Sequence, residues 1–184
     1  MNKIWFTSDT HFGSERTLQL SKRPFDSVID MDLYMIHSWN KVVGKNDTVY
    51  HLGDFGDFGC IKYLHGNINL IPGNYDRKDL NFFNLLDNPN ISERFHLLRN
   101  IEILNVAYND KDYKLFLAHE PTLLCNKKYK DNEFALFGHI HKLCMVKPFG
   151  LNVGIDCHTA PIDLNTVMFY MNGIKKHYDK NVFC

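Results

Sequence analysis

Short apolar runs that end in polar residues alternate with stretches of helical periodicity along the first half of the chain. The runs at residues 3–9, 48–54 and 68–74 each predict a strand with a polar end. Residues 30–43, between the first two runs, predict a helix. Its apolar residues recur at roughly helical spacing and are Met31, Tyr34, Met35, Trp39, Val42 and Val43. This alternation indicates a sheet covered by helices.

Two further helices are predicted in the first half. One is a short helix over residues 60–66. The other covers residues 77–87, where Leu80, Phe83 and Leu86 fall on one stripe. Each follows a predicted strand along the chain, so the alternation of strand and helix continues.

The second half of the chain is richer in predicted strands. Residues 109–112, Asn-Asp-Lys-Asp, predict a turn and therefore a hairpin between the strands on either side. Residues 164–173 fit a closing helix or a strand, and the pattern favours neither. The strand candidates are residues 101–108, 113–120, 134–141 and 151–156.

Length and composition predict one globular domain over residues 1–184. The chain is 45% hydrophobic and 23% charged, as is usual for soluble proteins. Lysine plus arginine equals aspartate plus glutamate at 21 each, so no overall field favours long nucleic acid or an acidic membrane. A small phosphate-bearing partner is compatible with this balance, because local charge and metal can hold it.

The five cysteines are scattered and form no C-x-x-C pair, which predicts reduced thiols rather than a disulfide framework. The apolar stretch at the N-terminus is too brief for a secretory signal, and no run of apolar residues is long enough to span a membrane. The last residue, Cys184, leaves no prenylation box. We therefore expect a cytoplasmic protein.

Metal-capable side chains stand at the ends of five predicted strands. In open α/β sheets, ligands bind outside the carboxyl ends of the strands, so these side chains are expected to converge. The members of each D-x-H or H-x-H pair are two residues apart, which in an extended segment points both to one face. The side chains are Asp9, His11, Asp54, Asn74, His119, His139 and His141.

This set combines imidazoles, carboxylates and one amide, with no cysteine. Such ligands suit Mn, Fe, Zn, Ni or Co better than calcium or magnesium. Seven ligands exceed what one tetrahedral zinc needs. If one carboxylate bridges, they divide into two groups of four, which describes a two-metal centre. Such centres hold their ions about 3.5–4 Å apart and clamp the attacking and leaving oxygens of a phosphoryl displacement.

Taken singly, each motif also has an ordinary structural explanation, such as a turn or a hydrogen-bonded histidine.

The ordered motifs D-x-H, G-D, G-N-x-D, H and G-H-x-H resemble those of the calcineurin-like metallophosphoesterase superfamily over residues 7–141. The chain is also similar to small phage and bacterial phosphoesterases that begin with T-S-D-x-H-F-G and continue with R-P-F, here residues 23–25. The resemblance implies an α/β (α+β) fold, a four-layer αββα sandwich of two mixed β-sheets flanked by helices.

The resemblance also implies two divalent metal ions and a water or hydroxide between them as nucleophile. A metal can lower the pKa of bound water from 15.7 to about 7, which makes hydroxide available at neutral pH. Asp54 is implied to bridge both ions. The other implied ligands are Asp9, His11 and His141 for one ion, and Asn74, His119 and His139 for the other.

The chain departs from the family at Tyr75, because the usual motif there is G-N-H-D. With a pKa near 10, tyrosine is a poor proton donor at pH 7. A phosphodiester carries one negative charge and needs less neutralisation than a monoester dianion. Tyr75 therefore favours phosphodiester substrates, including cyclic ones. The alternative is that Tyr75 turns outward and another group replaces the histidine.

Three further positions are candidates for supporting roles. Asp76 orients the histidine in the family, and here it is expected to hold a ligand or the loop instead. Arg16 and Arg77 lie near motifs and are candidates to bind substrate phosphate, as is Lys78. A solvated surface charge is the alternative for each cation.

The sequence thus predicts a two-metal phosphohydrolase that favours phosphodiesters, possibly cyclic or nucleotide ones. A phosphomonoesterase of the same fold is the first alternative. A non-catalytic interaction scaffold is the second, although all seven ligand positions keep chelating residues. A nuclease for long DNA is disfavoured by the charge balance. The expected catalytic residues are Asp54, Asn74, Tyr75, Asp76 and His119.

Overall fold

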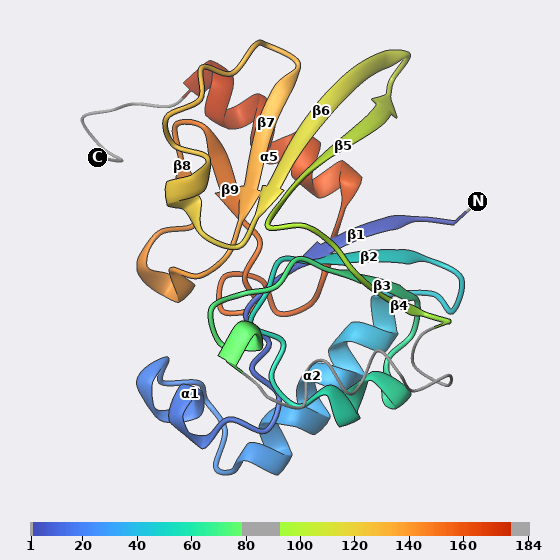
Figure 1. The fold of residues 1–184 in the computed structure, drawn as a ribbon, viewed down its shortest axis with the longest axis vertical. Helices are drawn as coiled ribbons and strands as arrows, with labels where there is room; N and C mark the ends of the chain where they lie inside the picture. Colours follow the sequence, from blue (N-terminus) through green and yellow to red (C-terminus); the bar gives the residue numbers. More distant parts are fainter. Residues whose placement is uncertain (1, 79–92, 178–184) are drawn as a thin grey trace.

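The computed structural model describes residues 2–78 and 93–177, which form two β-sheets stacked one against the other (Figure 1). The strand order is β10-β1-β2-β3-β4 in the first sheet and β5-β6-β7-β9-β8 in the second. Among the described residues the helices are α1 (Glu15–Leu20), α2 (Val28–Val42) and α5 (Leu164–His177), with 3-10 helices at Phe58–Tyr63, Asp76–Lys78, Pro121–Leu123 and His141–Leu143.

The first sheet is parallel from β1 to β4 and has an antiparallel edge strand, β10. Its strands are β1 (Ile4–Thr7), β2 (Thr48–His51), β3 (Asn67–Leu70), β4 (Phe95–Leu97) and β10 (Ile162–Asp163). Because β1, β2 and β3 run the same way, their carboxyl ends meet at one edge of the sheet, where ligands bind in open α/β folds.

The second sheet contains the predicted hairpin of β5 (Ile101–Tyr108) and β6 (Lys111–Ala118), which pair antiparallel. β6 pairs in parallel with β7 (Glu133–Phe137), and β7 with β9 (Gly150–Asn152). β8 (Val146–Lys147) completes the sheet in antiparallel pairing. Both sheets mix parallel and antiparallel pairs, so the prediction of an α/β fold with two mixed sheets is confirmed.

Helix α2 covers the outer face of the first sheet. Ser27 caps its N-terminus by accepting a hydrogen bond from the Asp30 N–H at 3.1 Å. The predicted helix over 30–43 is confirmed, with bounds shifted to Val28–Val42. The predicted buried face is correct for four positions, whereas Tyr34 and Val42 are exposed because they lie to the side of the stripe. The buried members are Met31, Met35, Trp39 and Val43.

The space between the sheets is filled by side chains that alternate along the strands. Phe6 of β1 faces this inter-sheet cluster, whereas its neighbour Trp5 faces α2. Residues 164–173, for which the pattern left two possibilities, are helical. Helix α5 adds a buried stripe to the same cluster, formed by Val167, Met168, Met171 and Ile174.

The opposite face of the second sheet carries a smaller cluster. Phe116 and Phe137 project there from β6 and β7 and meet Leu124 and Tyr129 of the connection between these strands. Among the described residues this face is covered by that connection rather than by an α-helix. α2 is therefore the helical layer on one side of the two sheets, and α5 packs with their shared core.

Several predicted boundaries were wrong in detail. The helix expected over 60–66 is a 3-10 helix at Phe58–Tyr63. Of the helix expected over 77–87, residues 79–87 lie outside the described part, and 77 and 78 belong to a 3-10 helix. The polar ends of predicted strands are not in the strands, because ladder pairing stops at Thr7, His51 and Leu70. The later strands predicted over 134–141 and 151–156 end at Phe137 and Asn152 for the same reason.

Two expectations about the chain as a whole can be compared with the structure. Four cysteines lie in the described part, at positions 60, 125, 144 and 157, and all are free thiols. Among residues 2–78 and 93–177, no helix has the length and apolar character needed to cross a membrane.

The hairpin turn has two residues, Asn109 and Asp110, and not the four that the sequence predicted. Tyr108 pairs with Lys111, and both turn residues have positive φ, 49° and 58°. This is the backbone of a type I′ turn, which suits the twist of a two-stranded ribbon.

We expect Asp110→Gly to raise the free energy of unfolding by up to about 1 kcal/mol, because glycine adopts a left-handed backbone without steric cost. Urea denaturation measures the change. Asp112→Gly is the matched control, since a glycine within β6 should lower stability. Equal effects at the two positions would contradict the turn assignment.

His51 is a fully buried histidine on the α2 side of the first sheet. Its ring stacks on Trp39, and its Nε2 lies 3.0 Å from Thr10 Oγ1. The Thr10 hydroxyl donates to the Phe55 carbonyl at 2.8 Å, so Nε2 is the nitrogen that carries hydrogen. Burial lowers the pKa of His51 to about 3. His51 is therefore neutral in the folded protein at every pH above that value.

Since an unfolded histidine has a pKa near 6.5, His51 contributes stability that is fully present above that pH and is lost as pH falls from about 6.5 toward 3. As the pH falls from about 6.5 toward 3, we expect the free energy of unfolding to decrease less in metal-free His51→Phe than in the metal-free native chain. Chemical denaturation at a series of pH values measures both. Parallel pH curves for the two proteins would contradict the assignment.

Candidate metal centre

The loops that follow β1 and β2 continue to pair through their backbones beyond the strands. The Asp9 N–H donates to the Gly53 carbonyl at 2.9 Å, and the His11 N–H donates to the Asp54 carbonyl at 3.0 Å. This pairing holds Asp9, His11 and Asp54 in register at the carboxyl edge of the first sheet.

The local backbone differs from the extended segments that the sequence predicted. Five of the seven candidate ligands have φ between 47° and 71°, in the left-handed region; they are Asp9, His11, Asp54, His139 and His141. In each D-x-H or H-x-H pair, both metal-capable residues are left-handed. The two side chains therefore converge by this twist and not by strand alternation. Left-handed backbone costs about 1–2 kcal/mol for a non-glycine residue, so the surroundings must offset it.

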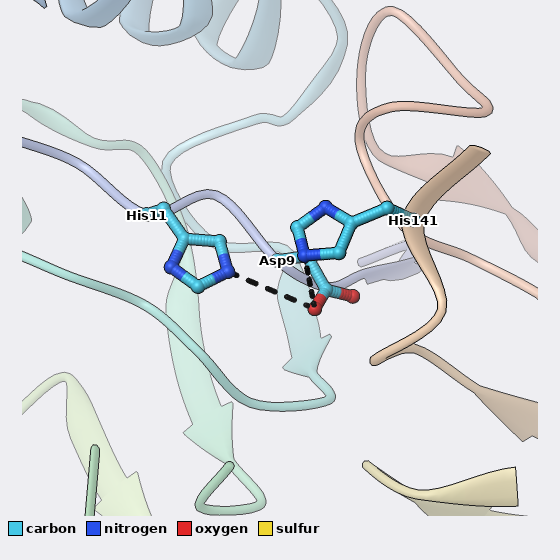
Figure 2. A group of neighbouring side chains, drawn as sticks. All are labelled: Asp9, His11 and His141. Carbon is cyan, nitrogen blue, oxygen red and sulfur yellow. Dashed lines mark ion pairs between the residues drawn. The ribbon is translucent and has the colours of Figure 1, made fainter. Parts of the chain in front are cut away.

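The first group of ligand candidates is Asp9, His11 and His141 (Figure 2). The Nε2 atoms of both histidines lie 3.9 Å from Asp9 Oδ1. The two imidazole rings stack with centroids 5.2 Å apart. Figure 2 shows both rings directed toward the same carboxylate, which is the arrangement of three donors around one small ion.

The second group is Asp54, His119 and His139, with Asn74 beside them. Asn74 Oδ1 lies 3.1 Å from His119 Nε2 and 3.0 Å from His139 Nδ1. Asp54 Oδ2 lies 3.4 Å from His119 Nε2. Ligands bound at about 2.1 Å to one ion are about 3.0–3.4 Å apart, so these spacings fit a shared ion.

Asp54 lies between the two groups. Its Oδ2 is 3.6 Å from His11 Nε2 in the first group and 3.4 Å from His119 Nε2 in the second. Its other oxygen, Oδ1, accepts a hydrogen bond from the Tyr75 N–H at 2.9 Å. One oxygen is thus fixed by the backbone, and the other faces both groups.

The surroundings of His11 and His119 leave a ring nitrogen of each available to a metal ion. The Nε2 of His11 is buried and has no hydrogen-bond partner within the described part of the chain, and burial lowers the pKa of His11 to about 4. His119 Nδ1 bonds the Leu52 carbonyl at 2.7 Å, which leaves its Nε2 lone pair directed at the site. Neutral imidazoles with free lone pairs are what a divalent ion requires.

The site also favours positive charge. Burial lowers the pKa of His119, but the Asp54 hydrogen bond and the carboxylates of Asp9 and Asp54 raise it overall to about 9. The carboxylates therefore favour positive charge at this position. The donor set and its charge fit two divalent cations.

Arg23 and Asp156 support the site and were not predicted as functional residues. The Asp156 carboxylate lies 2.6 Å from His141 Nδ1 and accepts from Arg23 Nε at 2.9 Å. Arg23 also donates to the Asp9 carbonyl at 2.6 Å and to the Thr10 carbonyl at 2.7 Å. The guanidinium therefore ties the left-handed loop after β1 to His141. The R-P-F segment was the sequence signal that marked Arg23. No motif in the sequence marked Asp156.

Asp76 accepts three backbone hydrogen bonds around the second group. The Asp54 and Gly73 N–H groups donate to Oδ2 at 2.7 and 2.8 Å, and the Phe55 N–H donates to Oδ1 at 2.9 Å. Asp76 thereby clamps the loop after β2 to the loop after β3. Of the two roles that the sequence left open, the geometry is that of holding the loop.

Two glycines are required by close approach. A Cβ on Gly138 would overlap Ser8 Oγ and Asp9 Oδ2. Gly53 has φ +93°, and a Cβ there would lie 2.6 Å from His119 Nδ1. These positions let the strand ends of the two sheets come together at the ligands.

Tyr75 lies at the mouth of the site and is not turned away from it. Its ring meets the His11 ring edge-on with centroids 5.3 Å apart, and the residue is 42% exposed. The Arg16 guanidinium and the Lys78 ammonium each lie 5.8 Å from the ring centre. Arg16 and Tyr75 line a cavity of about 510 Å³ together with His11, His139 and His141.

Arg77 is held by the protein and does not line this cavity. Its Nη2 donates to the Pro72 carbonyl at 2.7 Å and to Asn100 Oδ1 at 3.1 Å, and Nη1 lies 4.0 Å from Glu120. The sequence pattern could not separate Arg16 from Arg77, because both lie close to a motif.

The fold and the site define an α/β protein with a two-group histidine–carboxylate centre at the facing edges of its sheets. Residues 2–154 match the family model described as the calcineurin-like phosphoesterase superfamily domain. The chain therefore belongs to the calcineurin-like phosphoesterase superfamily, whose members are hydrolases that typically bind divalent metals.

Similar proteins include an uncharacterised one from Methanocaldococcus jannaschii, 34% identical over 129 residues. That match covers 66% of this chain and 60% of the relative, so the chain spans less than two thirds of that protein. The Gene 66 protein of Mycobacterium phage D29 is 26% identical, with 96% of this chain and 99% of the relative covered. A protein of unknown function from Aquifex aeolicus has a similar solved structure, with 22% identity and a TM-score of 0.68 over 92% of this chain and 100% of that chain. This last likeness shows the fold alone.

We expect Asp156→Asn to lower the affinity for one of two bound ions by about 10–100-fold, because His141 loses the carboxylate that orients its ring. Calorimetric titration of the metal-free protein with Mn²⁺ or Zn²⁺ measures the affinity. Asp131→Asn, at an exposed position, is the matched control. Unchanged affinity in a folded Asp156→Asn protein would contradict the role of Asp156.

Proposed function

We propose that this protein is a two-metal phosphodiesterase. The observation that carries the proposal is the position of Asp54, whose Oδ2 lies within 3.6 Å of a histidine nitrogen in each ligand group. A carboxylate oxygen shared by two groups of ligands is the feature that distinguishes a two-ion centre from two separate sites.

One ion would be held by the first group and the other by the second, with Asp54 common to both. The held ions would lower the pKa of a bound water from 15.7 to about 7 and neutralise phosphate oxygens. The ligand chemistry suits manganese, iron, zinc, nickel or cobalt. The residues are Asp9, His11 and His141 in the first group, and Asn74, His119 and His139 in the second.

The chain's own groups prepare the site for this chemistry. The Tyr75 N–H fixes one oxygen of Asp54, so the other stays directed at both groups. Asp76 accepts hydrogen bonds from the backbone N–H groups of Asp54 and Phe55 and so fixes the loop that carries Asp54. Arg16 and Lys78 bring positive charge to the mouth, where a substrate phosphate enters.

The preference for diesters rests on Tyr75. Its ring occupies the mouth beside His11, and its phenol has no hydrogen-bond partner among the described residues. It therefore supplies neither a positive charge nor an activated proton to a leaving alkoxide at pH 7. A diester with one negative charge and a good leaving group needs these least. A phosphomonoesterase is the rival, and a scaffold role would leave the seven ligand candidates without a purpose.

We also propose, from the scattered cysteines and the charge balance of the sequence, a cytoplasmic enzyme for small phosphate esters. The four free thiols in the described part are compatible with a reducing compartment.

The direct test compares a chromogenic phosphodiester with the matching monoester. Metal-stripped protein is reconstituted in turn with Mn, Ni, Zn, Co and Mg, and both rates are measured. We expect the diester to be hydrolysed faster than the monoester. Asn74→Ala and Asp54→Ala should abolish turnover, whereas Asn105→Ala, on the exposed side of β5, should not. Faster monoester hydrolysis would overturn the diesterase proposal, and failure to bind ions would overturn the metal centre.

Tyr75→His is expected to raise the monoester-to-diester rate ratio by at least about tenfold, because imidazolium adds a charge and a proton donor at the mouth. Tyr63→His is the matched control, since Tyr63 is also an exposed tyrosine beneath a lysine but lines none of the described cavities around the site. The ratio is measured with both proteins at saturating metal. An equal ratio in both variants would contradict the role given to Tyr75.

A further inference from the structure

Tyr75 divides the surface in front of the ligand groups into two cavities. The larger, about 510 Å³, lies between α1 and the loop from His139 to Leu143. The smaller, about 320 Å³, is lined by Ser14, Gly56 and Lys78 on the other side. His11 and Tyr75 line both cavities, so the two meet at the first ligand group.

A phosphomonoester has one substituent, and it would leave one of these cavities empty. A phosphodiester has two, which leave the phosphorus in different directions. Two cavities that share His11 match two ester substituents on one phosphate. Their volumes fall in the range of pockets for small organic groups, about 300–1,000 Å³. The cavities therefore point to a diester with a sizeable group on each side.

Each cavity also carries a cationic side chain without a hydrogen bond or ion pair to the described residues 2–78 and 93–177. The Arg16 guanidinium, in the larger cavity, forms no hydrogen bond or ion pair with any residue of the described part. The same holds for the Lys78 ammonium in the smaller cavity. Both instead lie over the ring of Tyr75, on which a cation gains only modest attraction at an exposed site. By contrast, Arg23 and Arg77 are engaged by carboxylates and carbonyls.

The larger cavity contains two more cations, Lys22 and Lys142. The Lys142 ammonium reaches the Lys22 carbonyl at 3.5 Å, across the gap between the 139–143 loop and the end of α1. Unengaged positive charge therefore lies on both sides of the position for the scissile phosphate. Such charges match further anions on the substrate, beyond the phosphate that reacts.

Apolar and aromatic side chains form part of the remaining walls. Leu20 and Leu143, which are 70% and 88% exposed, border the larger cavity, and the exposed ring of Tyr75 borders both cavities. An exposed aromatic ring flanked by cations is a feature by which proteins hold single-stranded nucleic acid, whose bases stack while its phosphates pair with charge. The zero net charge of the chain agrees with a short contact of this kind and not with a long one.

We propose that the substrate is a short single-stranded oligonucleotide, bound across Tyr75 so that the scissile phosphate is flanked by a phosphate on each side. Arg16 and Lys142 pair with one flanking phosphate, and Lys78 pairs with the other. This inference rests on the proposed phosphodiesterase function and adds the class of substrate to it. Water is the second reactant: one P–O ester bond breaks, a new P–O bond forms to the water oxygen, and the proton goes to the leaving oxygen.

The test compares a tetranucleotide, whose central phosphate has a neighbour on each side, with a dinucleoside monophosphate that has none. Both deoxy and ribo forms are used, beside the chromogenic diester. We expect kcat/KM for the tetranucleotide to exceed that for the dinucleoside monophosphate by about tenfold or more, and the excess to shrink as salt rises. Arg16→Gln and Lys78→Gln should each reduce this ratio about threefold or more.

Lys62→Gln is the matched control, because Lys62 also lies over an exposed tyrosine ring, at 4.8 Å, but lines neither cavity. Its ratio should equal that of the native chain. A second readout is the binding of a labelled tetranucleotide to metal-free protein by fluorescence anisotropy, which we expect Arg16→Gln and Lys78→Gln to weaken and Lys62→Gln to leave unchanged.

The outcomes separate the two proposals. Equal kcat/KM for the tetranucleotide and the dinucleoside monophosphate, with the chromogenic diester hydrolysed, would overturn the oligonucleotide inference and leave the phosphodiesterase intact. Absence of diester hydrolysis with every metal would overturn the proposed function. Equal tetranucleotide affinity in the native chain, Arg16→Gln and Lys78→Gln would also overturn the oligonucleotide inference, whatever the turnover.

Discussion

The crowding of buried carboxylates and imidazoles where the two sheets meet is the constraint on which the rest of the structure depends. Burying such a cluster costs free energy, because the charged groups lose their hydration and like charges repel one another. The cluster therefore exists only where the backbone and neighbouring side chains hold it together. Arg23 and Asp76 do this from two sides, one tying the loop after β1 to Asp156 and the other clamping the loops after β2 and β3. The left-handed backbone at Asp9 and His139 is part of the same arrangement.

Charged side chains at the mouth of the site have fewer partners than the charged side chains within the ligand groups. Inside, the carboxylates accept several hydrogen bonds, and two of the histidines are oriented, His119 by the Leu52 carbonyl and His141 by Asp156. At the mouth, Arg16 and Lys78 keep no partner among the described residues except the face of Tyr75. A site whose carboxylates are paired in its interior and whose cations are unpaired at its entrance is prepared for an anionic ligand that arrives from outside. Tyr75 joins the two regions, because its N–H holds Asp54 while its ring separates the cavities.

Much of the fold followed from pattern alone, because its signals are local. The apolar stripe of Met31, Met35 and Trp39 is sufficient to predict α2, and Asn109 with Asp110 marks the hairpin. The pattern failed where the signal is not local. Residues 164–173 were ambiguous because a helix buried on most of one face resembles a strand in composition, and packing against both sheets decided the outcome. The strand ends were misplaced because ladder pairing stops where the neighbouring strand stops.

The sequence by itself determined the ligand types and their order, because residue chemistry and the spacing of short motifs are properties of the chain. It also identified Tyr75 as the departure from the family. Only the tertiary structure decided which residues support these ligands. Asp156 contacts His141, 15 positions away in the sequence, and Arg23, 133 positions away. Arg16 and Arg77 differ solely in the residues that surround them. The two cavities belong to the tertiary structure for the same physical reason. A pocket, an ion pair and a buried charge depend on distances between segments that the order of residues along the chain does not contain.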